Sequence, residues 1–227
     1  MTKIALSLGI CFVTLLTCAQ NYNFGLNSFS FLNSIYSSRS AGIGSNLITI
    51  SDKDVGLTVA NPSLLNEDQL RSIQLNQGIM PSGVQTGMLC YAFKKKYGIF
   101  SPVIKYQNYG KFNGTDELGN ATNNFSAIDY SIGMNFSHSV GKTIKVGLGL
   151  HLIGSHLEAY SSLGIHSLMG ATFKHPNQDF SASFVVKNIG YQLMSYANSE
   201  RSPLPVEVQA GLSYKLNHAP FRISLLG

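Results

Sequence analysis

VEVQAGLSYKL, residues 206–216, alternates apolar and polar side chains without a break. One set of alternate positions carries Val206, Val208, Ala210, Leu212, Tyr214 and Leu216, and the other carries Glu207, Gln209, Gly211, Ser213 and Lys215. Successive side chains of a β-strand point to opposite faces. The stretch therefore predicts a strand with one apolar face and one polar face.

The same alternation recurs along most of the chain. From about residue 70 onward we expect strands and turns, with strands at 69–80, 84–93, 97–107, 125–137, 143–156, 161–174, 179–190 and 205–217 and a last one starting at 221. Glycine recurs on the polar faces, at Gly133, Gly147, Gly149 and Gly211. Small residues at those positions suit a crowded, filled interior.

The composition fits a membrane barrel and also fits a soluble β-sandwich. Charged residues make up 12% of the 227 residues, whereas a soluble domain has about 25%. Beyond the N-terminus no apolar run approaches the roughly 20 residues of a membrane-spanning helix. A soluble β-sandwich remains the alternative fold.

The connections between the predicted strands favour the barrel. Short connections fall at Lys94–Lys96, His138–Gly141, His175–Gln178 and His218–Pro220, and long polar ones at Tyr109–Asn124 and Tyr191–Leu204. Outer-membrane barrels have short turns on the periplasmic rim and longer loops outside. Two short connections, at 81–83 and 157–160, fall on the long-loop rim and break this rule. We predict an all-β, antiparallel transmembrane β-barrel over residues 67–227, with about nine strands.

Residues 1–19 form a predicted signal peptide. Lys3 precedes an apolar stretch over Ile4–Leu16, and Thr17-Cys18-Ala19 is a small-residue cleavage site. The protein is therefore expected to be exported to the outer membrane. A lipid-modified Cys18 is the alternative reading of the same site.

Residues 20–66, named the hatch segment below, carry no strand pattern. Within them Ser51-Asp52 would cap a short helix through Lys53–Ala60, which Asn61-Pro62 would end. We expect the segment to lie outside the barrel wall or to plug its lumen.

Few residues point to chemistry. Cleavage after Ala19 leaves Cys90 as the one remaining cysteine, and we interpret it as a packing residue. Ser139–Lys142 matches an S-x-x-K motif but lies in a tight turn, without the accompanying S-D-N and K-T-G motifs. His151, His156 and His166 could approach one another on adjacent strands, but no ligand spacing supports a metal. The sequence therefore predicts no catalytic residue, no metal and no cofactor.

The charge pattern excludes nucleic acid as an expected partner. The formal net charge is +5, and most lysines, such as Lys94–Lys96, fall in predicted turns, which we interpret as solvated. Asp116 and Glu117 lie between glycines and asparagines in the long loop, which is a turn composition. Tyr109 and Phe112 lie close by and fit an outer aromatic girdle.

Several motifs, taken in order, resemble a known family. The first four are Phe31-Leu32, Ser38–Gly44, Asp52–Val55 and Ala60–Leu65, and the later ones are Asn108–Gly110 with Asp116–Asn120, Lys187–Gly190 and Leu216–Arg222. The opening motifs are similar to those of the PorV/PorQ group, FadL-like outer-membrane proteins of the type IX secretion system of Bacteroidetes. The later motifs resemble the PorQ branch of that group. The resemblance covers essentially the whole mature chain.

The resemblance implies a FadL-like barrel of about fourteen strands, roughly five more than the chain supplies, so the chain is expected to be C-terminally truncated. It implies that Asn61, Pro62, Leu64 and Leu65 belong to an N-terminal hatch motif. It also implies a non-enzymatic component of the surface complex that processes and attaches secreted cargo, beside proteins like PorU, PorV and PorZ.

Three functions stay open at this point. The first is a scaffold whose outer loops hold a partner, with contacts expected at Tyr109, Phe112, Asp116 and Glu117, and with no small-molecule substrate. The second is a FadL-like transporter of hydrophobic small molecules, although the expected lumen residues are polar. The third is a secreted soluble β-protein, which would leave the membrane pellet without detergent.

Overall fold

A computed structural model describes residues 27–44, 46–115, 118–196, 201–216, 219 and 221–227 of the chain. The predicted signal peptide and two expected contact residues, Asp116 and Glu117, lie outside these residues. Within the described residues, no helix is both long enough and apolar enough to cross a membrane.

The fold is all-β, with a single antiparallel sheet of ten strands. The strands are β1 (Ile73–Ile79), β2 (Gln85–Tyr91), β3 (Phe93–Lys95), β4 (Gly98–Phe112), β5 (Phe125–Val140), β6 (Ile144–Leu157), β7 (Tyr160–Lys174), β8 (Phe180–Met194), β9 (Glu207–Lys215) and β10 (Arg222–Leu226). Apart from β3, which pairs with β4 alone, neighbours in the sheet follow chain order. All nine predicted strands are present, and β3 is an additional short one.

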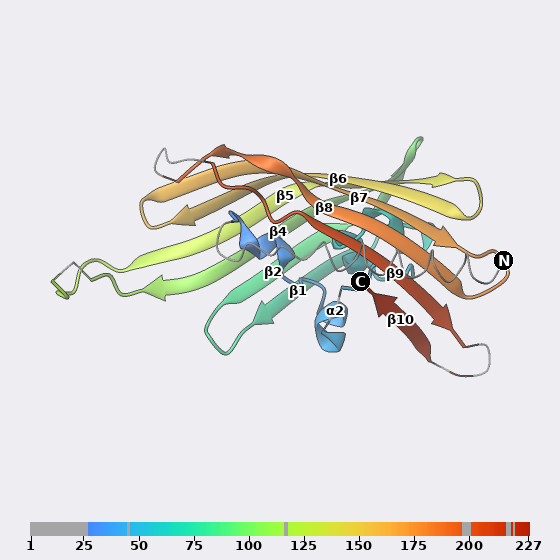
Figure 1. The fold of residues 1–227 in the computed structure, drawn as a ribbon, viewed down its shortest axis with the longest axis horizontal. Helices are drawn as coiled ribbons and strands as arrows, with labels where there is room; N and C mark the ends of the chain where they lie inside the picture. The colour runs from blue at the N-terminus through green and yellow to red at the C-terminus, as the bar shows by residue number, and fades with distance from the viewer. Residues whose placement is uncertain (1–26, 45, 116–117, 197–200, 217–218, 220) are drawn as a thin grey trace, which may run out of the picture.

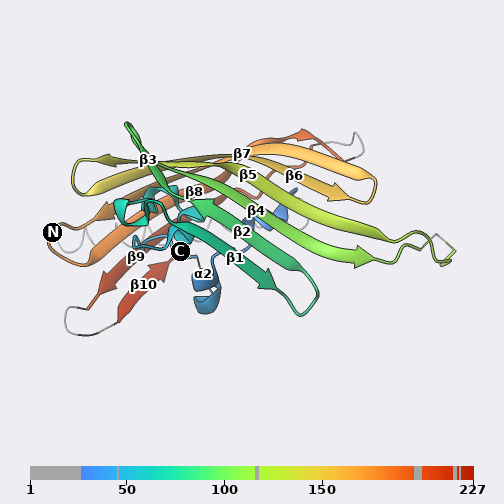
Figure 2. The same cartoon turned by 180° about the vertical axis from the view of Figure 1, so that it is seen from behind.

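The sheet is curved and open. Its end strands are β1 and β10, and among the described residues these two do not pair with each other. In Figures 1 and 2 the sheet bends around residues 27–44 and 46–72, which lie on its concave side. The antiparallel all-β fold is thus confirmed, whereas the described sheet does not close into the expected barrel.

The described residues of the hatch segment carry four short helices, where the sequence predicted one, and no strand. They are η1 (Ser30–Asn33), α2 (Ser38–Ile43), η2 (Val55–Val59) and η3 (Pro62–Leu64), and η4 (Glu67–Gln69) follows before β1. The helix expected over Lys53–Ala60 is the shorter 3-10 helix η2. Its cap is Asp54, whose side chain accepts a hydrogen bond from the Gly56 amide, rather than Ser51 or Asp52. The motif Ser38–Gly44 is α2 with its C-cap, Gly44, in the left-handed conformation at φ 70°.

On the strands of the sheet, many polar side chains are buried and many apolar side chains are exposed, which is the reverse of the usual pattern in a soluble protein. In β5, Ser131 and Asn135 are fully buried on the concave face, whereas Ile132 on the convex face is 52% exposed. The same holds in β9, where Gln209 and Ser213 are buried and Val208 and Leu212 are exposed. Local alternation creates two faces on every strand, and the hatch segment covers the polar one.

The concave face is not polar throughout, contrary to the expected lumen of glycine, serine, lysine, glutamine and asparagine. Met88 and Cys90 of β2 and Val103 of β4 are buried there in one apolar cluster with Phe31 and Leu65. The hatch segment is itself rich in apolar side chains, so it supplies the partners that make apolar inner residues favourable on these strands. Cys90 is therefore a packing residue of this cluster.

Candidate functional site

The motif at Asn61–Leu65 is fixed to the sheet by buried hydrogen bonds. The Asn61 amide nitrogen donates to the Ile48 carbonyl at 2.8 Å and to Thr172 Oγ1 at 3.2 Å. Asn61 Oδ1 accepts from the Ser63 amide at 3.0 Å and from Ser63 Oγ at 2.7 Å. All four polar positions of one side chain are used, and the motif is held against β7. Of the expected hatch residues, Pro62, Leu64 and Leu65 are also buried.

Two glycines of the sheet make room for this motif. A Cβ on Gly147 of β6 would lie 2.2 Å from the Ser63 amide nitrogen, and one on Gly170 of β7 would lie 2.1 Å from Asn61 Oδ1. No side chain fits at such distances, so the glycines are where the hatch backbone approaches the sheet. The sequence pattern had predicted that Gly147 faces a crowded interior.

A second hydrogen-bonded cluster closes the hatch segment at its end. Asn66 and Gln69 form a capping box at η4. The Asn66 side chain also donates to Ser51 Oγ at 3.0 Å and to the Asp52 carbonyl at 2.9 Å. The Gln69 side chain donates to the same Asp52 carbonyl at 2.8 Å. These bonds join residues 51–54 to residues 66–69.

Ionisable groups near the hatch are shifted by burial and by pairing. Burial raises the pKa of Tyr36 above its ordinary value, and its hydroxyl donates to the Phe31 carbonyl at 3.2 Å. The hydrogen bond from Lys94 lowers the pKa of the exposed Glu67 carboxyl. On the concave face, Lys187 of β8 forms an ion pair with Glu207 of β9, with 2.8 Å between Nζ and Oε2.

The histidines proposed as possible metal ligands are only partly brought together. His151 and His166 face each other across β6 and β7, and their rings stack at 5.1 Å. His151 Nε2 lies 2.9 Å from Asn135 Oδ1, whereas neither ring nitrogen of His166 has a hydrogen-bond partner among the described residues. His156 is exposed and lies 2.9 Å from Ser161 Oγ. In the described part of the chain no group of three or more ligating side chains is assembled.

Two of the expected partner contacts, Tyr109 and Phe112, lie on β4, in the hairpin of β4 and β5 that projects beyond the other strands (Figure 1). The loop is shorter than predicted, because β4 continues to Phe112 and β5 begins at Phe125. Phe112 is exposed and stacks on Phe125 at 5.3 Å between ring centroids. Tyr109 instead turns back to the sheet, where its hydroxyl donates to Asp129 Oδ2 at 2.7 Å. Phe112 is thus presented at the surface, and Tyr109 is a structural residue.

Two motifs that carried the family resemblance form irregular points of the sheet. The register of β4 shifts between Asn108 and Gly110, where Gly110 has φ 88° and its amide donates to Asn108 Oδ1 at 2.9 Å. In β8, Asn188 has φ 61° and its side chain donates to Asn33 Oδ1 at 2.8 Å and to the Pro205 carbonyl at 3.0 Å. Such bulges bend the strands, and the side chain of Asn188 also joins β8 to Asn33 of the hatch segment.

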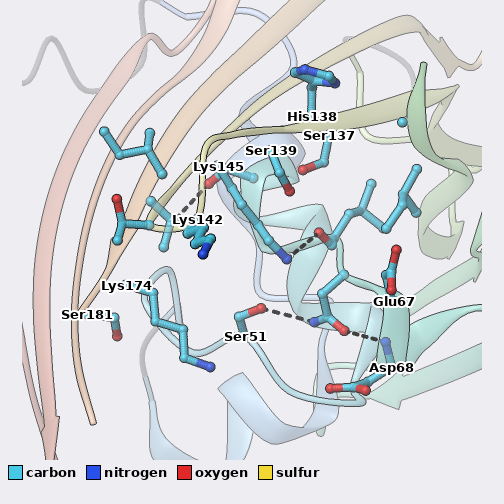
Figure 3. A pocket seen from close by; sticks show the side chains of 18 of the residues that line it. Ser51, Glu67, Asp68, Ser137, His138, Ser139, Lys142, Lys145, Lys174 and Ser181 are labelled. Atoms are coloured by element: carbon cyan, nitrogen blue, oxygen red, sulfur yellow. Dashed lines mark hydrogen bonds between the residues drawn. The ribbon is translucent and has the colours of Figure 1, made fainter. Parts of the chain in front are cut away.

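A cavity of about 570 Å³ opens at the rim that carries the short turns. Its walls come from the turns at 94–98 and 137–143, from the ends of β7 and β8, and from residues of the hatch segment. Figure 3 shows the side chains of Lys142, Lys145 and Lys174 among those that line it. Both ends of the S-x-x-K motif, Ser139 and Lys142, line this cavity.

Sequence reasoning missed this cavity, as it missed η1, α2 and the apolar cluster. The signal for α2 was present, because Ser37 and Gly44 are typical cap residues at the two ends of a short helix. The cavity had no such local signal, since its lysines come from the ends of separate strands and from the turns beside them. In comparisons with known proteins, neither a family model nor a curated protein sequence matches this chain.

Proposed function

We propose that this chain is the wall of a β-barrel in the outer membrane. The inverted burial carries this proposal: on β5, Asn135 is fully buried while its neighbour Met134 is 40% exposed. In water an outward apolar face over most of a sheet is unfavourable, because each apolar side chain loses about 1.5–3 kcal/mol by staying exposed. The hydrocarbon core of a bilayer removes that penalty. It also requires the backbone N–H and C=O groups to be hydrogen-bonded within the protein, as they are between these long antiparallel strands.

Within that membrane, the protein acts as a non-enzymatic scaffold of the type IX secretion system. The order of motifs that resembles the PorV/PorQ group, and its PorQ branch in particular, supports this assignment. The partners would be the proteins that process and attach cargo at the cell surface, which resemble PorU, PorV and PorZ. The projecting hairpin with Phe112 at its base is the surface best placed to hold such a partner.

A filled interior favours scaffolding over transport of hydrophobic small molecules. Transport would need an open apolar path along the concave face. The apolar inner residues Met88 and Val103 pack against Phe31 of the hatch segment, and the polar ones bond to its Asn61 and Ser63. Uptake of a labelled fatty acid that depends on this gene would favour the transporter instead.

Deleting the gene in its host and comparing the surface and secreted proteins by mass spectrometry tests the proposed function. We expect cargo proteins to disappear from the surface or to lose their attachment. A chain lacking the hairpin tip, residues 113–123, should remain in the membrane fraction but fail to restore cargo attachment. An unchanged surface proteome in the deletion strain would contradict the secretion role.

A further inference from the structure

The cavity at the short-turn rim has a strongly basic lining. Seven lysine or arginine side chains line it, against three carboxylates. One of those carboxylates, Glu67, is already paired with Lys94. The remaining lining is therefore basic, although the turns that supply it looked like ordinary solvated turns in the sequence.

Three lysines that line the cavity, Lys142, Lys145 and Lys174, are the central feature of the lining. Lys145 Nζ donates a long bond of 3.5 Å to the Leu65 carbonyl of the hatch segment. Lys142 and Lys174 form no ion pair with the described residues, and Figure 3 shows their side chains directed to the same space as that of Lys145. Like charges held close together repel, and an anion placed between them would remove that repulsion.

Hydroxyl groups complete an environment suited to oxygen-rich anions. Ser137, Ser139 and Thr143 line the cavity together with Lys142, and Ser51 and Ser181 line it as well. Ser51 and Ser181 already donate their single hydroxyl protons to the backbone carbonyls of Leu64 and Thr49, so the hydroxyls offered to an anion are those of Ser137, Ser139 and Thr143. Lysine with nearby hydroxyls is a common way to bind phosphate as a compact charge.

We propose that this cavity binds the phosphate group of a small molecule or of a lipid headgroup. Its volume of about 570 Å³ lies in the range of small-molecule sites, roughly 300–1,000 Å³, so the phosphate would be one end of a larger ligand. The site lies at the rim opposite the projecting hairpin. It is thus independent of the surface proposed to hold the secretion partner.

Calorimetric titration of the full chain in uncharged detergent micelles tests this proposal. The two probes are inorganic phosphate and micelles containing phosphatidylglycerol, and micelles containing diacylglycerol are the uncharged lipid control. We expect the double variant K142Q/K174Q to bind at least tenfold more weakly than the native chain. The variant K142R/K174R, which keeps both charges, should retain binding.

A matched control separates the site from general surface charge. Lys53 and Lys111 are exposed and do not line the cavity, so K53Q/K111Q removes the same charge elsewhere and should bind like the native chain. Binding of both probes identifies a phosphate group from any source, and binding of phosphatidylglycerol alone identifies a lipid headgroup. Equal losses in the two double variants, or no binding of either probe by the native chain, would overturn the proposal.

Protein folding is checked in the same samples by circular dichroism. Both altered lysines are exposed and Lys142 lies in a turn, so K142Q/K174Q is expected to keep the native β-signal. If the double variant does not fold, Lys142→Gln alone is the milder test, with Lys53→Gln as its control. Identical affinities of these two single variants would then count against the site.

Discussion

Ser63 Oγ lies 2.7 Å from Thr172 Oγ1, although 109 positions separate the two residues in the chain. Thr172 Oγ1 in turn lies 2.8 Å from Ser183 Oγ of β8. A row of buried hydroxyls therefore joins the hatch motif to two neighbouring strands. This contact holds the covering segment in place on the concave face of the sheet.

Asn61→Ala should lower the free energy of unfolding by about 2 kcal/mol. The change leaves the buried Ile48 carbonyl without this donor, removes one of the hydrogen-bond partners of Thr172 Oγ1, and removes the cap of η3. Urea unfolding in micelles, followed by circular dichroism because the chain has no tryptophan, measures the effect. Asn124→Ala, at an exposed loop position, should change stability by less than about 0.5 kcal/mol. Equal midpoints for the two variants would show that the hatch contacts are dispensable.

Gly147→Ala should displace the hatch motif from the sheet. The added Cβ would lie 2.2 Å from the Ser63 amide nitrogen, and backbone cannot yield as a flexible side chain can, so we expect a cost of about 1–3 kcal/mol. Limited proteolysis should then cut within residues 46–66 faster than in the native chain. Gly42→Ala is the control, since nothing lies within 4 Å of its Cβ. Unaltered protection of the segment in Gly147→Ala would contradict the close approach.

Leu150→Arg tests whether the convex face lies in lipid. Leu150 is in the middle of β6 and 54% exposed. In a bilayer, arginine at mid-depth costs about 2–4 kcal/mol, whereas in water an exposed substitution changes stability by less than about 0.5 kcal/mol. Unfolding in lipid vesicles measures the difference.

The matched control for that substitution is Val140→Arg. Val140 is 52% exposed but lies at the very end of β5, where the cost in a bilayer falls to about 0–1 kcal/mol. The proposal expects a clear difference between the two variants. If both are as stable as the native chain, the exposed apolar face is not in lipid, and a soluble protein becomes the better interpretation.

Phe112→Ala and Tyr109→Phe should have opposite effects on binding and stability. Phe112 is exposed on the projecting hairpin, so its loss should weaken retention of the surface partner and leave stability nearly unchanged. Tyr109→Phe removes the hydrogen bond to Asp129 and should cost about 1–2 kcal/mol while partner retention persists. Co-purification from surface-crosslinked cells measures retention of the partner, and urea unfolding measures the change in stability. If Tyr109→Phe lost the partner while Phe112→Ala retained it, the assignment of the partner contact to Phe112 would be wrong.

The strands of this protein could be predicted from the sequence because their signal is local. A side chain's face depends only on its parity within the strand, so the run from Val206 to Leu216 reveals two faces without any knowledge of neighbours. Turn residues mark the ends of the strands in the same local way. The short β3 escaped prediction because three residues are too few to show an alternation.

Contacts between distant residues were decided only by the tertiary structure. The alternation of side chains does not say which face of the sheet is covered by another part of the chain. The hydrogen bond of Asn61 to Thr172 of β7 shows that the hatch segment covers the polar face. The apolar residues Met88 and Cys90 became inner residues because Phe31 and Leu65 of the hatch segment lie against them. The basic cavity likewise exists because antiparallel pairing brings the turns carrying Lys94, Lys142 and Lys174 to the same rim, although each looks like a solvated turn by itself.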